Sequence, residues 1–465
     1  MRDANFLTEN NARQIWHPMA HPAEMQASPP RIIMKGEGVH VTDLDGRTVL
    51  DAVGGLWNVN LGYSCDPIKQ AIAAQLAVLP YYSGFRGTST GPSIELAWEL
   101  AQWFAPEGMV RTFFTSGGSD SVESALRLAR QYWKIRGERD RTKFIALKKG
   151  YHGTHFGGAS VNGNANFRRN YEPLLPGVFH TPVPWTYRNP FGETDPARLA
   201  DLCARALEDE IAFQGPDTVA AFIMEPVGGA ATAALVAPDS YYPRIREICD
   251  RYGILLIHDE VMSGAGRTGK FLGGDHFDCK PDIVALSKGL GSGYAPLGAL
   301  AASMRLVQPL LASGGFQHGH TYAGNPLACA AGLAVLGEMD RLDLIANAAD
   351  MGELLMAELK GLAKRFPFIA DVRGKGLLLG AEMVADPDTL RPIAPAKRAT
   401  QRLLDLAYER GLIIYGRKVK GGVDGDNFMV APPMIVTREQ IGEIVAIIGD
   451  SLQVLAGELD LPVEG

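Results

Sequence analysis

Two short apolar runs of the chain lead to residues that could carry chemistry. Residues 254–257 are all isoleucine or leucine and lead to Asp259, and residues 283–286 lead to Lys288. Runs this short and this continuously apolar are typical of buried strands in a parallel sheet rather than of surface helices. Ligands bind at the carboxyl edge of such sheets. We therefore predict that the Asp259 carboxylate and the Lys288 amine lie in one crevice.

A carboxylate and an amine in one crevice are compatible with more than one role. A lysine can form a Schiff base with a carbonyl cofactor and later act as a base. A pyridoxal phosphate site pairs that lysine with an acid at the pyridinium nitrogen. A single Asp–Lys pair is more often a simple salt bridge, so this pair alone leaves both interpretations open.

Three more predicted strands, at residues 109–115, 143–147 and 218–224, end in residues suited to a site. These are Gly117, Gly118 and Ser119 after the first strand, Tyr151 and His152 after the second, and Glu225 after the third. A glycine turn before a helix exposes backbone N–H groups at the positive end of the helix dipole, which favours a phosphate. Strands that alternate with helical segments predict an α/β fold with a mainly parallel, doubly wound sheet.

The remaining elements are predicted from hydrophobic periodicity and turn residues. We expect a hairpin at 38–50, helices at 66–79, 92–105, 197–214, 326–339, 396–410 and 437–456, a turn and strand at 293–299, and C-terminal strands at 372–380 and 412–415. Residues 160–195 contain five prolines and are predicted to form a loop.

The composition argues against several functional classes. The chain has 465 residues, a net charge of −7, 46% hydrophobic and 21% charged residues, which is ordinary for a globular enzyme. It shows no basic patch of the kind that nucleic acid requires, no signal peptide and no uncharged apolar run of membrane-spanning length. The five cysteines are scattered, so we expect reduced thiols, a cytoplasmic location and no metal site. His318 and His320 have no nearby carboxylate to complete such a site.

Three motifs together resemble one enzyme family. Residues 259–269 follow the pattern Asp-Glu-Val-x-x-Gly-x-Gly-Arg-Thr-Gly, residues 287–290 are Ser-Lys-Gly-Leu, and residues 151–153 are Tyr-His-Gly. This combination resembles the class III (ω-type) aminotransferases of pyridoxal phosphate (PLP) fold type I, over nearly the whole chain. The resemblance implies three parts: an N-terminal arm and hairpin packed with the small domain (1–60), a large PLP-binding domain with a mainly parallel seven-stranded sheet (61–328), and a smaller α+β C-terminal domain (329–465).

The resemblance also implies which residues bind the cofactor. Lys288 would hold it covalently, and Asp259 would keep its ring nitrogen protonated. The rest of the implied set is Tyr151 on the ring face, His152, Glu225 and Val261 around the ring, and Gly117, Gly118, Ser119 and Thr321 at the phosphate. Thr321 would act across the interface of a homodimer, and a tetramer of such dimers is left open. For Glu225, a strand-end carboxylate in water remains the alternative.

Four residues are implied for the apolar side of the substrate pocket: Trp57, Phe85, Tyr151 and Ala230. A buried carboxylate needs a cation, and arginine offers a bidentate fork. A fixed arginine facing an apolar amine would leave a buried unpaired charge. We therefore predict that Arg417, on a glycine-hinged loop of residues 415–426, moves toward and away from the substrate. Its rival is Arg86, which stands where the family usually has an aromatic residue.

The activity implied is transfer of an amino group from an amine (an ω-amine or an amino acid) to a keto acid such as pyruvate. Other members of the same fold remain as alternatives: a diaminopelargonate-forming aminotransferase of biotin synthesis, which residues 16–18 and 324–328 also resemble, an aminomutase or a decarboxylase. A non-catalytic PLP-binding regulator would need a DNA-binding extension, and we expect no room for one before Trp16. Neither a nucleic-acid nor a membrane partner is expected.

Overall fold

The computed structural model describes residues 3–418 and 425–464, and its largest sheet has seven strands. In spatial order they are β4 (Met109–Thr115), β10 (Gly298–Ser303), β9 (Ile283–Leu286), β8 (Leu255–Asp259), β7 (Val219–Met224), β5 (Lys143–Leu147) and β6 (Val178–Thr181). Strand β10 runs antiparallel to both neighbours, and the pairs from β9 to β6 are parallel. The carboxyl ends of the other six strands therefore meet at one edge. This confirms the predicted α/β class with a mainly parallel seven-stranded sheet.

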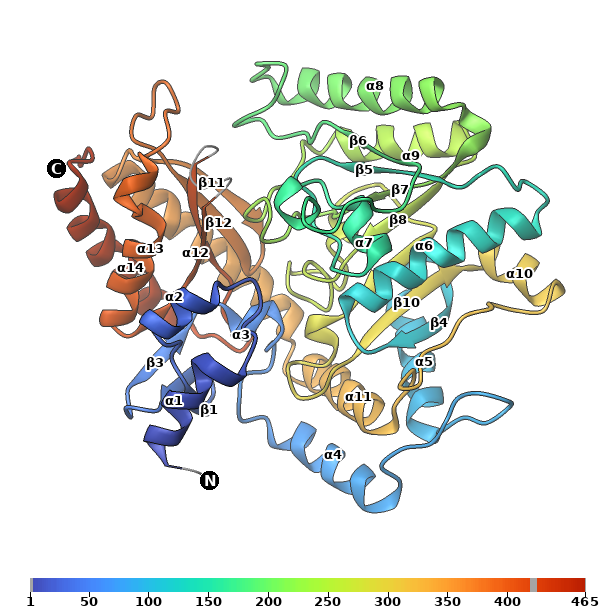
Figure 1. The fold of residues 1–465 in the computed structure, drawn as a ribbon, viewed down its shortest axis with the longest axis horizontal. Coiled ribbons are helices and arrows are strands. Elements are labelled where there is room, and N and C mark those ends of the chain that lie inside the picture. Colours follow the sequence, from blue (N-terminus) through green and yellow to red (C-terminus); the bar gives the residue numbers. More distant parts are fainter. Residues whose placement is uncertain (1–2, 419–424, 465) are drawn as a thin grey trace.

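Helices cover both faces of this sheet (Figure 1). One face carries α6 (Gly118–Ile135), α7 (Phe156–Val161) and α10 (Met304–Ala312), and the other carries α5 (Gly91–Trp103), α8 (Pro196–Gln214), α9 (Tyr241–Arg251) and α11 (Pro326–Arg341). Alternate strand residues point to opposite faces. Phe144 and Ala146 of β5 thus pack with the α6 cluster, and Ile145 with that of α8. Burial on both faces explains why strands such as β7 and β9 are continuously apolar.

Two smaller sheets complete the fold. The C-terminal sheet contains β11 (Ile369–Lys375), β12 (Leu378–Met383), β15 (Asp426–Val430) and β14 (Tyr415–Lys418), and the N-terminal sheet contains β1 (Ile33–Glu37), β2 (His40–Asp43), β3 (Thr48–Asp51) and β13 (Leu412–Ile413). Because β13 pairs with β3, the N-terminal hairpin is joined to the C-terminal part of the chain. The domain boundaries near residues 60 and 328 stay predictions.

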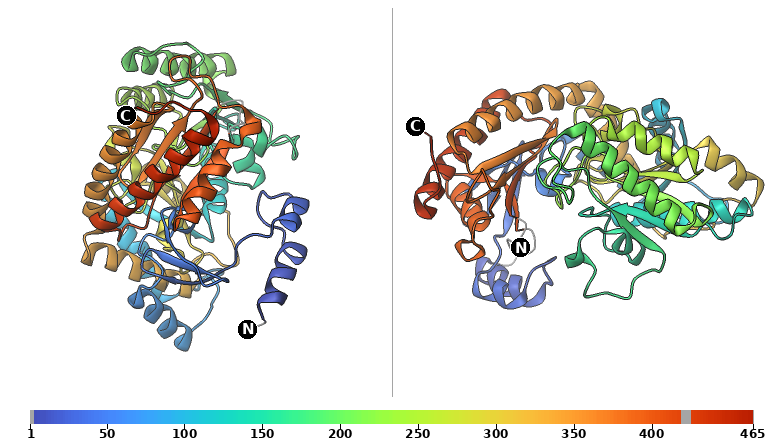
Figure 2. Two further views of the ribbon diagram at one scale, coloured as in Figure 1. Left: turned by 90° about the vertical axis from the view of Figure 1, so that its left-hand side faces the viewer. Right: turned by 90° about the horizontal axis from the view of Figure 1, so that it is seen from above.

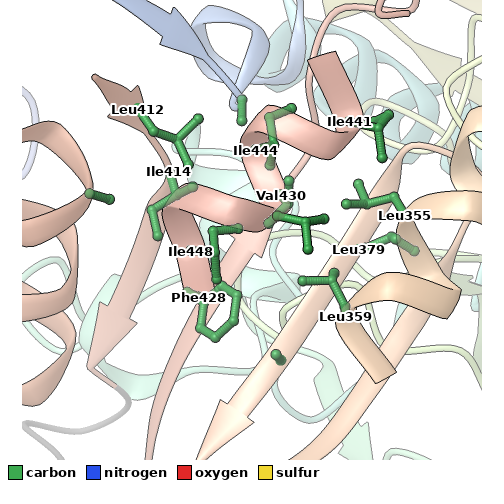
Figure 3. Packing of buried hydrophobic residues seen from close by; sticks show 14 of the residues in the cluster. Leu355, Leu359, Leu379, Leu412, Ile414, Phe428, Val430, Ile441, Ile444 and Ile448 are labelled. Atoms are coloured by element: carbon green, nitrogen blue, oxygen red, sulfur yellow. The ribbon is translucent and has the colours of Figure 1, made fainter. Parts of the chain in front are cut away.

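Three helices pack on the C-terminal sheet: α12 (Leu344–Arg365), α13 (Ala399–Glu409) and α14 (Arg438–Leu459). They lie side by side in Figure 2, in orange to red. Figure 3 shows Leu355 of α12, Ile448 of α14 and Phe428 of the sheet in one buried cluster, with Ile448 beside Phe428. By length and composition alone α14 could cross a membrane, but half of its most apolar window is buried inside the structure. It therefore has the burial of a core helix.

The N-terminal part holds the remaining helices: α1 (Ala4–Gln14), α2 (Pro22–Ala27), the short kinked α3 (Gly54–Trp57) and α4 (Asp66–Val78). Figure 1 shows α1 and α2, in dark blue, beside the C-terminal domain. Along the described chain the predicted helices are all present, with ends shifted by a few residues.

The predictions of secondary structure for residues 160–195 and 372–380 were wrong. Residues 160–195 are not all loop, because β6 lies among them as the edge strand of the large sheet. Its flanking prolines, Pro176 and Pro182, favoured a loop, although an edge strand tolerates proline at its ends. Residues 372–380 are not one strand but parts of the β11–β12 hairpin, which turns at Gly376 with a φ of 51°. Three leucines at residues 377–379 follow the turn glycine directly, so the segment resembles the end of a single strand.

Candidate active site

A cavity of about 450 Å³ lies at the carboxyl edge of the seven-stranded sheet. It brings together most of the residues predicted from the sequence. Those that line it are Trp57, Gly118, Ser119, Tyr151, His152, Glu225, Ala230, Asp259, Val261, Lys288 and Arg417. Gly117 lies directly before this set, as the N-cap of α6. Residues from both ends of the chain thus close over the strand ends.

Lys288 comes just after β9, where the backbone turns with a φ of +45°. Non-glycine residues rarely adopt this conformation, and when they do it is often at a functional site. Burial lowers the pKa of the Lys288 ammonium, although the charges of Asp259 and Glu225 oppose the shift. A lowered pKa increases the fraction of neutral amine, which is the nucleophilic form.

Asp259 ends β8, the neighbour of β9 in the sheet. One carboxylate oxygen accepts a hydrogen bond from the Val261 N–H at 3.1 Å, and the other lies 2.8 Å from Nδ1 of His152. Burial by itself lowers the pKa of His152, but the hydrogen bond to Asp259 and the charge of Asp259 outweigh it, so the pKa is raised. His152 thus fixes the orientation of the Asp259 carboxylate.

Glu225 follows β7 and accepts hydrogen bonds from the N–H groups of Tyr151 and Gly229, at 3.2 and 2.9 Å. Burial raises the pKa of Glu225 to about 7; the charge of His152 opposes this rise and that of Asp259 adds to it. The side chain therefore belongs to the cavity wall, and the alternative of a strand-end carboxylate in bulk water does not describe it.

The turn between β4 and α6 has the features of an anion site. Gly117 is the N-cap of α6, and in the described chain no side chain caps this helix, so its first N–H groups are available to a ligand. A Cβ on Gly118 would lie 2.7 Å from a methyl carbon of Val261, which makes glycine necessary there. The Ser119 hydroxyl accepts a hydrogen bond from the Thr154 N–H at 3.1 Å, and its own hydrogen can be donated to a ligand.

These observations fit pyridoxal phosphate. The glycine turn at the start of α6 suits a phosphate, Lys288 provides the amine for the aldehyde, and Asp259 provides the acid for the ring nitrogen. The Tyr151 side chain lines the same cavity and contacts Phe167, with ring centroids 4.7 Å apart.

Aromatic and apolar side chains form the remainder of the wall. Trp57 is 5% exposed and packs edge-on against Tyr415, with ring centroids 4.7 Å apart. The Trp57 ring is therefore both core and pocket wall. Lining residues that were not predicted include Met19, Leu56, Phe167, Met262 and Tyr415. An isolated apolar residue has no sequence pattern that marks it as part of a site. Met262 and Tyr415 could have been predicted only from their position beside predicted site segments.

Arg417 lines the cavity, but its predicted setting was wrong. It lies in strand β14, opposite Asn427 of β15, and not in a loop. Burial lowers the pKa of Arg417, and its guanidinium carbon is 4.6 Å from the centroid of the Phe167 ring. The part of the predicted hinge loop at residues 419–424 lies outside the described residues.

Phe85, Arg86 and Thr321 lie apart from this cavity. The Phe85 side chain is 51% exposed and lines a separate hollow of about 440 Å³ together with residues 318–320. Arg86 is exposed, with a φ of 57°, and the backbone oxygen of Thr321 accepts a hydrogen bond from the Tyr81 hydroxyl at 2.8 Å. Within one chain, therefore, these three residues do not contribute to the cavity.

Known proteins are similar to this chain in sequence and in fold. The family described as aminotransferase class-III matches residues 22–452. A taurine–pyruvate aminotransferase of Bilophila wadsworthia is 37% identical over 96% of both chains, and a putrescine–pyruvate aminotransferase of Pseudomonas aeruginosa is 35% identical over 90% of this chain and 89% of the relative. The PLP-bound structure of an amine transaminase from an uncultivated Pseudomonas species is 42% identical, with a TM-score of 0.91 over 95% of this chain and 99% of that one.

The fold and the site define a PLP enzyme of fold type I. More specifically, the chain belongs to the class III aminotransferase family and is a PLP-dependent transaminase.

Bound PLP supplies an electron sink for negative charge that develops at the amine-bearing carbon of the substrate. The Lys288 amine would serve as the base that moves the proton at that carbon. Asp259, oriented by His152, would keep the ring nitrogen protonated. The N–H groups at Gly118 and the hydroxyl of Ser119 would hold the phosphate, and the apolar wall around Trp57 would exclude water.

The substitution Lys288→Ala should abolish turnover without unfolding the protein. Loss of the base alone costs about 10²–10⁴-fold in rate, and this variant also loses the covalent attachment point. Turnover is measured with an amine and pyruvate, and folding by circular dichroism. Lys364→Ala, at an exposed position of α12, is the control and should keep full activity. Recovery of a borohydride-stable cofactor adduct from Lys288→Ala would contradict the assignment.

The raised pKa of Glu225 predicts a pH-dependent stability of the cofactor-free protein. A carboxyl whose pKa rises from 4.5 to about 7 on folding favours the folded state fully below pH 4.5, and this contribution is lost as the pH rises through 7. Glu225→Gln should therefore lose less thermal stability than wild type between pH 5 and 8. Glu358→Gln, at an exposed position, should follow wild type. Parallel melting-temperature profiles for wild type and Glu225→Gln would refute the prediction.

Proposed function

We propose that the protein transfers an amino group from an amine to a keto acid such as pyruvate, as an ω-type transaminase. One observation supports this most directly: the cavity that holds Lys288 and Asp259 also contains Arg417 within an otherwise largely apolar wall. The two half-reactions make opposite demands on that wall. The amine brings an apolar substituent, and the keto acid brings a carboxylate.

Arg417 meets these demands because it lies at the end of its element. The guanidinium can form a bidentate hydrogen-bonded pair with a carboxylate. Strand β14 ends at Lys418, so a small change of side-chain torsions can move the guanidinium toward or away from the substrate. The names of the two relatives pair pyruvate with different amines, and this supports pyruvate as the acceptor more than any one donor.

We also propose a homodimer in which Thr321 completes the phosphate site of the second subunit. Exposed large side chains gather on the two segments that meet near Thr321: Tyr82, Phe85 and Tyr322 are each more than half exposed. Exposed apolar surface of this kind marks an interaction site.

We propose a cytoplasmic location because all five cysteines are free, as is usual for proteins of that reducing compartment.

The dimer proposal predicts that activity and association are lost together. Sedimentation of the PLP-loaded enzyme under assay conditions should show a dimer across the active concentration range. Thr321→Ala should weaken cofactor binding, measured by release of PLP on dilution, without dissociating the dimer. A monomer with full activity would refute the proposal.

The carboxylate role predicts a selective effect of Arg417→Ala. The pyruvate KM should rise about 10- to 100-fold, because a hydrogen bond to a charged group contributes about 1.5–3 kcal/mol. Turnover of benzylamine, which lacks a carboxylate, should change little in its own half-reaction. The rival assignment is tested by Arg86→Ala: if that variant shows this pattern and Arg417→Ala does not, the carboxylate is bound by the other arginine.

A further inference from the structure

Phe167 lies between two other side chains of the cavity wall. Its ring centroid is 4.7 Å from that of Tyr151, with the rings inclined at 60°, and 4.6 Å from the guanidinium carbon of Arg417. The three residues come from separate segments: the turn after β5, the 3-10 turn Ala165–Phe167, and β14. Phe167 is 8% exposed, so its ring is held in place by the surrounding structure.

The charge of Arg417 has little other compensation. None of the ion pairs formed within residues 3–418 and 425–464 includes Arg417. Burial lowers the pKa of Arg417, and the groups that oppose the shift are the hydroxyls of Tyr415 and Tyr151. A buried cation without an anion is unfavourable, whereas the face of an aromatic ring attracts a cation, most strongly where water is excluded.

We propose that Phe167 is a specificity-determining residue whose ring holds Arg417 whenever the substrate in the cavity lacks a carboxylate. This inference rests on the proposed function, in which Arg417 binds the carboxylate of the keto acid. A keto acid draws the guanidinium off the ring, because a charge-assisted bidentate hydrogen bond is stronger than the ring contact. An amine without a carboxylate leaves it on the ring, so no unpaired cation faces the apolar substituent.

A double-variant cycle on the full-length PLP-loaded enzyme tests this coupling. The variants are Phe167→Leu, Arg417→Ala and their combination, assayed with benzylamine and with pyruvate in separate half-reactions followed by cofactor absorbance. Phe167→Leu should raise the benzylamine KM about 3- to 10-fold, within the roughly 2- to 30-fold range of a cation–π contact. The pyruvate KM should stay constant or fall. In the Arg417→Ala background the same change should alter the benzylamine KM by less than about 2-fold, because the coupled partner is absent.

Two control variants separate the ring contact from general packing. Phe167→Tyr keeps an aromatic face and should keep both wild-type KM values. Phe179→Leu also removes a phenylalanine that faces a cation, with Nζ of Lys143 6.0 Å from its centroid, but it lies outside the cavity and should change neither value. Calorimetric binding of propanoate, a carboxylate that does not react, gives a readout independent of turnover: Phe167→Leu should bind it as tightly as wild type or more tightly.

The outcomes distinguish this inference from the proposed function on which it rests. Equal effects of Phe167→Leu with and without Arg417 would overturn the inference alone, because the ring would then only pack against substrate. Weaker propanoate binding by Phe167→Leu would do the same. An unchanged pyruvate KM in Arg417→Ala would overturn the proposed function, and the inference with it.

Discussion

The structure depends on the pairing of two parallel strands that end at the same edge. Asp259 of β8 is in register with Ala285 of β9, and neighbouring strands lie about 4.8 Å apart. The chain therefore delivers the Lys288 amine, three residues further on, to the crevice that holds the Asp259 carboxylate. Burial lowers the pKa of Lys288 while Asp259 opposes that shift, so the same pairing positions both groups and adjusts the ionisation of Lys288.

A second constraint closes the cavity from outside the large sheet. Arg267, in the loop after β8, is 1% exposed. It donates hydrogen bonds to Oδ1 of Asn60 at 2.7 Å and to the backbone oxygens of Leu377 and Ala431, both at 3.4 Å. Burial lowers the pKa of Arg267 to about 10, so it remains charged at neutral pH. One side chain thus joins the N-terminal, central and C-terminal parts of the chain that carry the cavity walls.

The cavity handles charge in two different ways. At the cofactor end, Asp259 is matched by His152 and faces Lys288, so its charge is compensated by neighbours. At the other end, Arg417 lies on the ring of Phe167, and under the proposed function it exchanges that contact for a carboxylate. Compensated charge suits a group that keeps one role through the reaction. Weakly compensated charge suits a group that must accept two kinds of substrate.

The sequence by itself determined the class of fold, because a parallel sheet covered on both faces requires apolar strands, and five largely apolar runs are visible in it. It also indicated Asp259 and Lys288, because strand-end residues of a parallel sheet share one edge. It did not reveal β6 or the β11–β12 hairpin, since prolines flank the first and three leucines directly follow the turn glycine of the second. Only the tertiary structure decided that Met19, Phe167 and Tyr415 meet at one cavity and that Arg417 lies in a strand. Those contacts join segments hundreds of residues apart, and an isolated apolar side chain leaves no local pattern that indicates its distant neighbours.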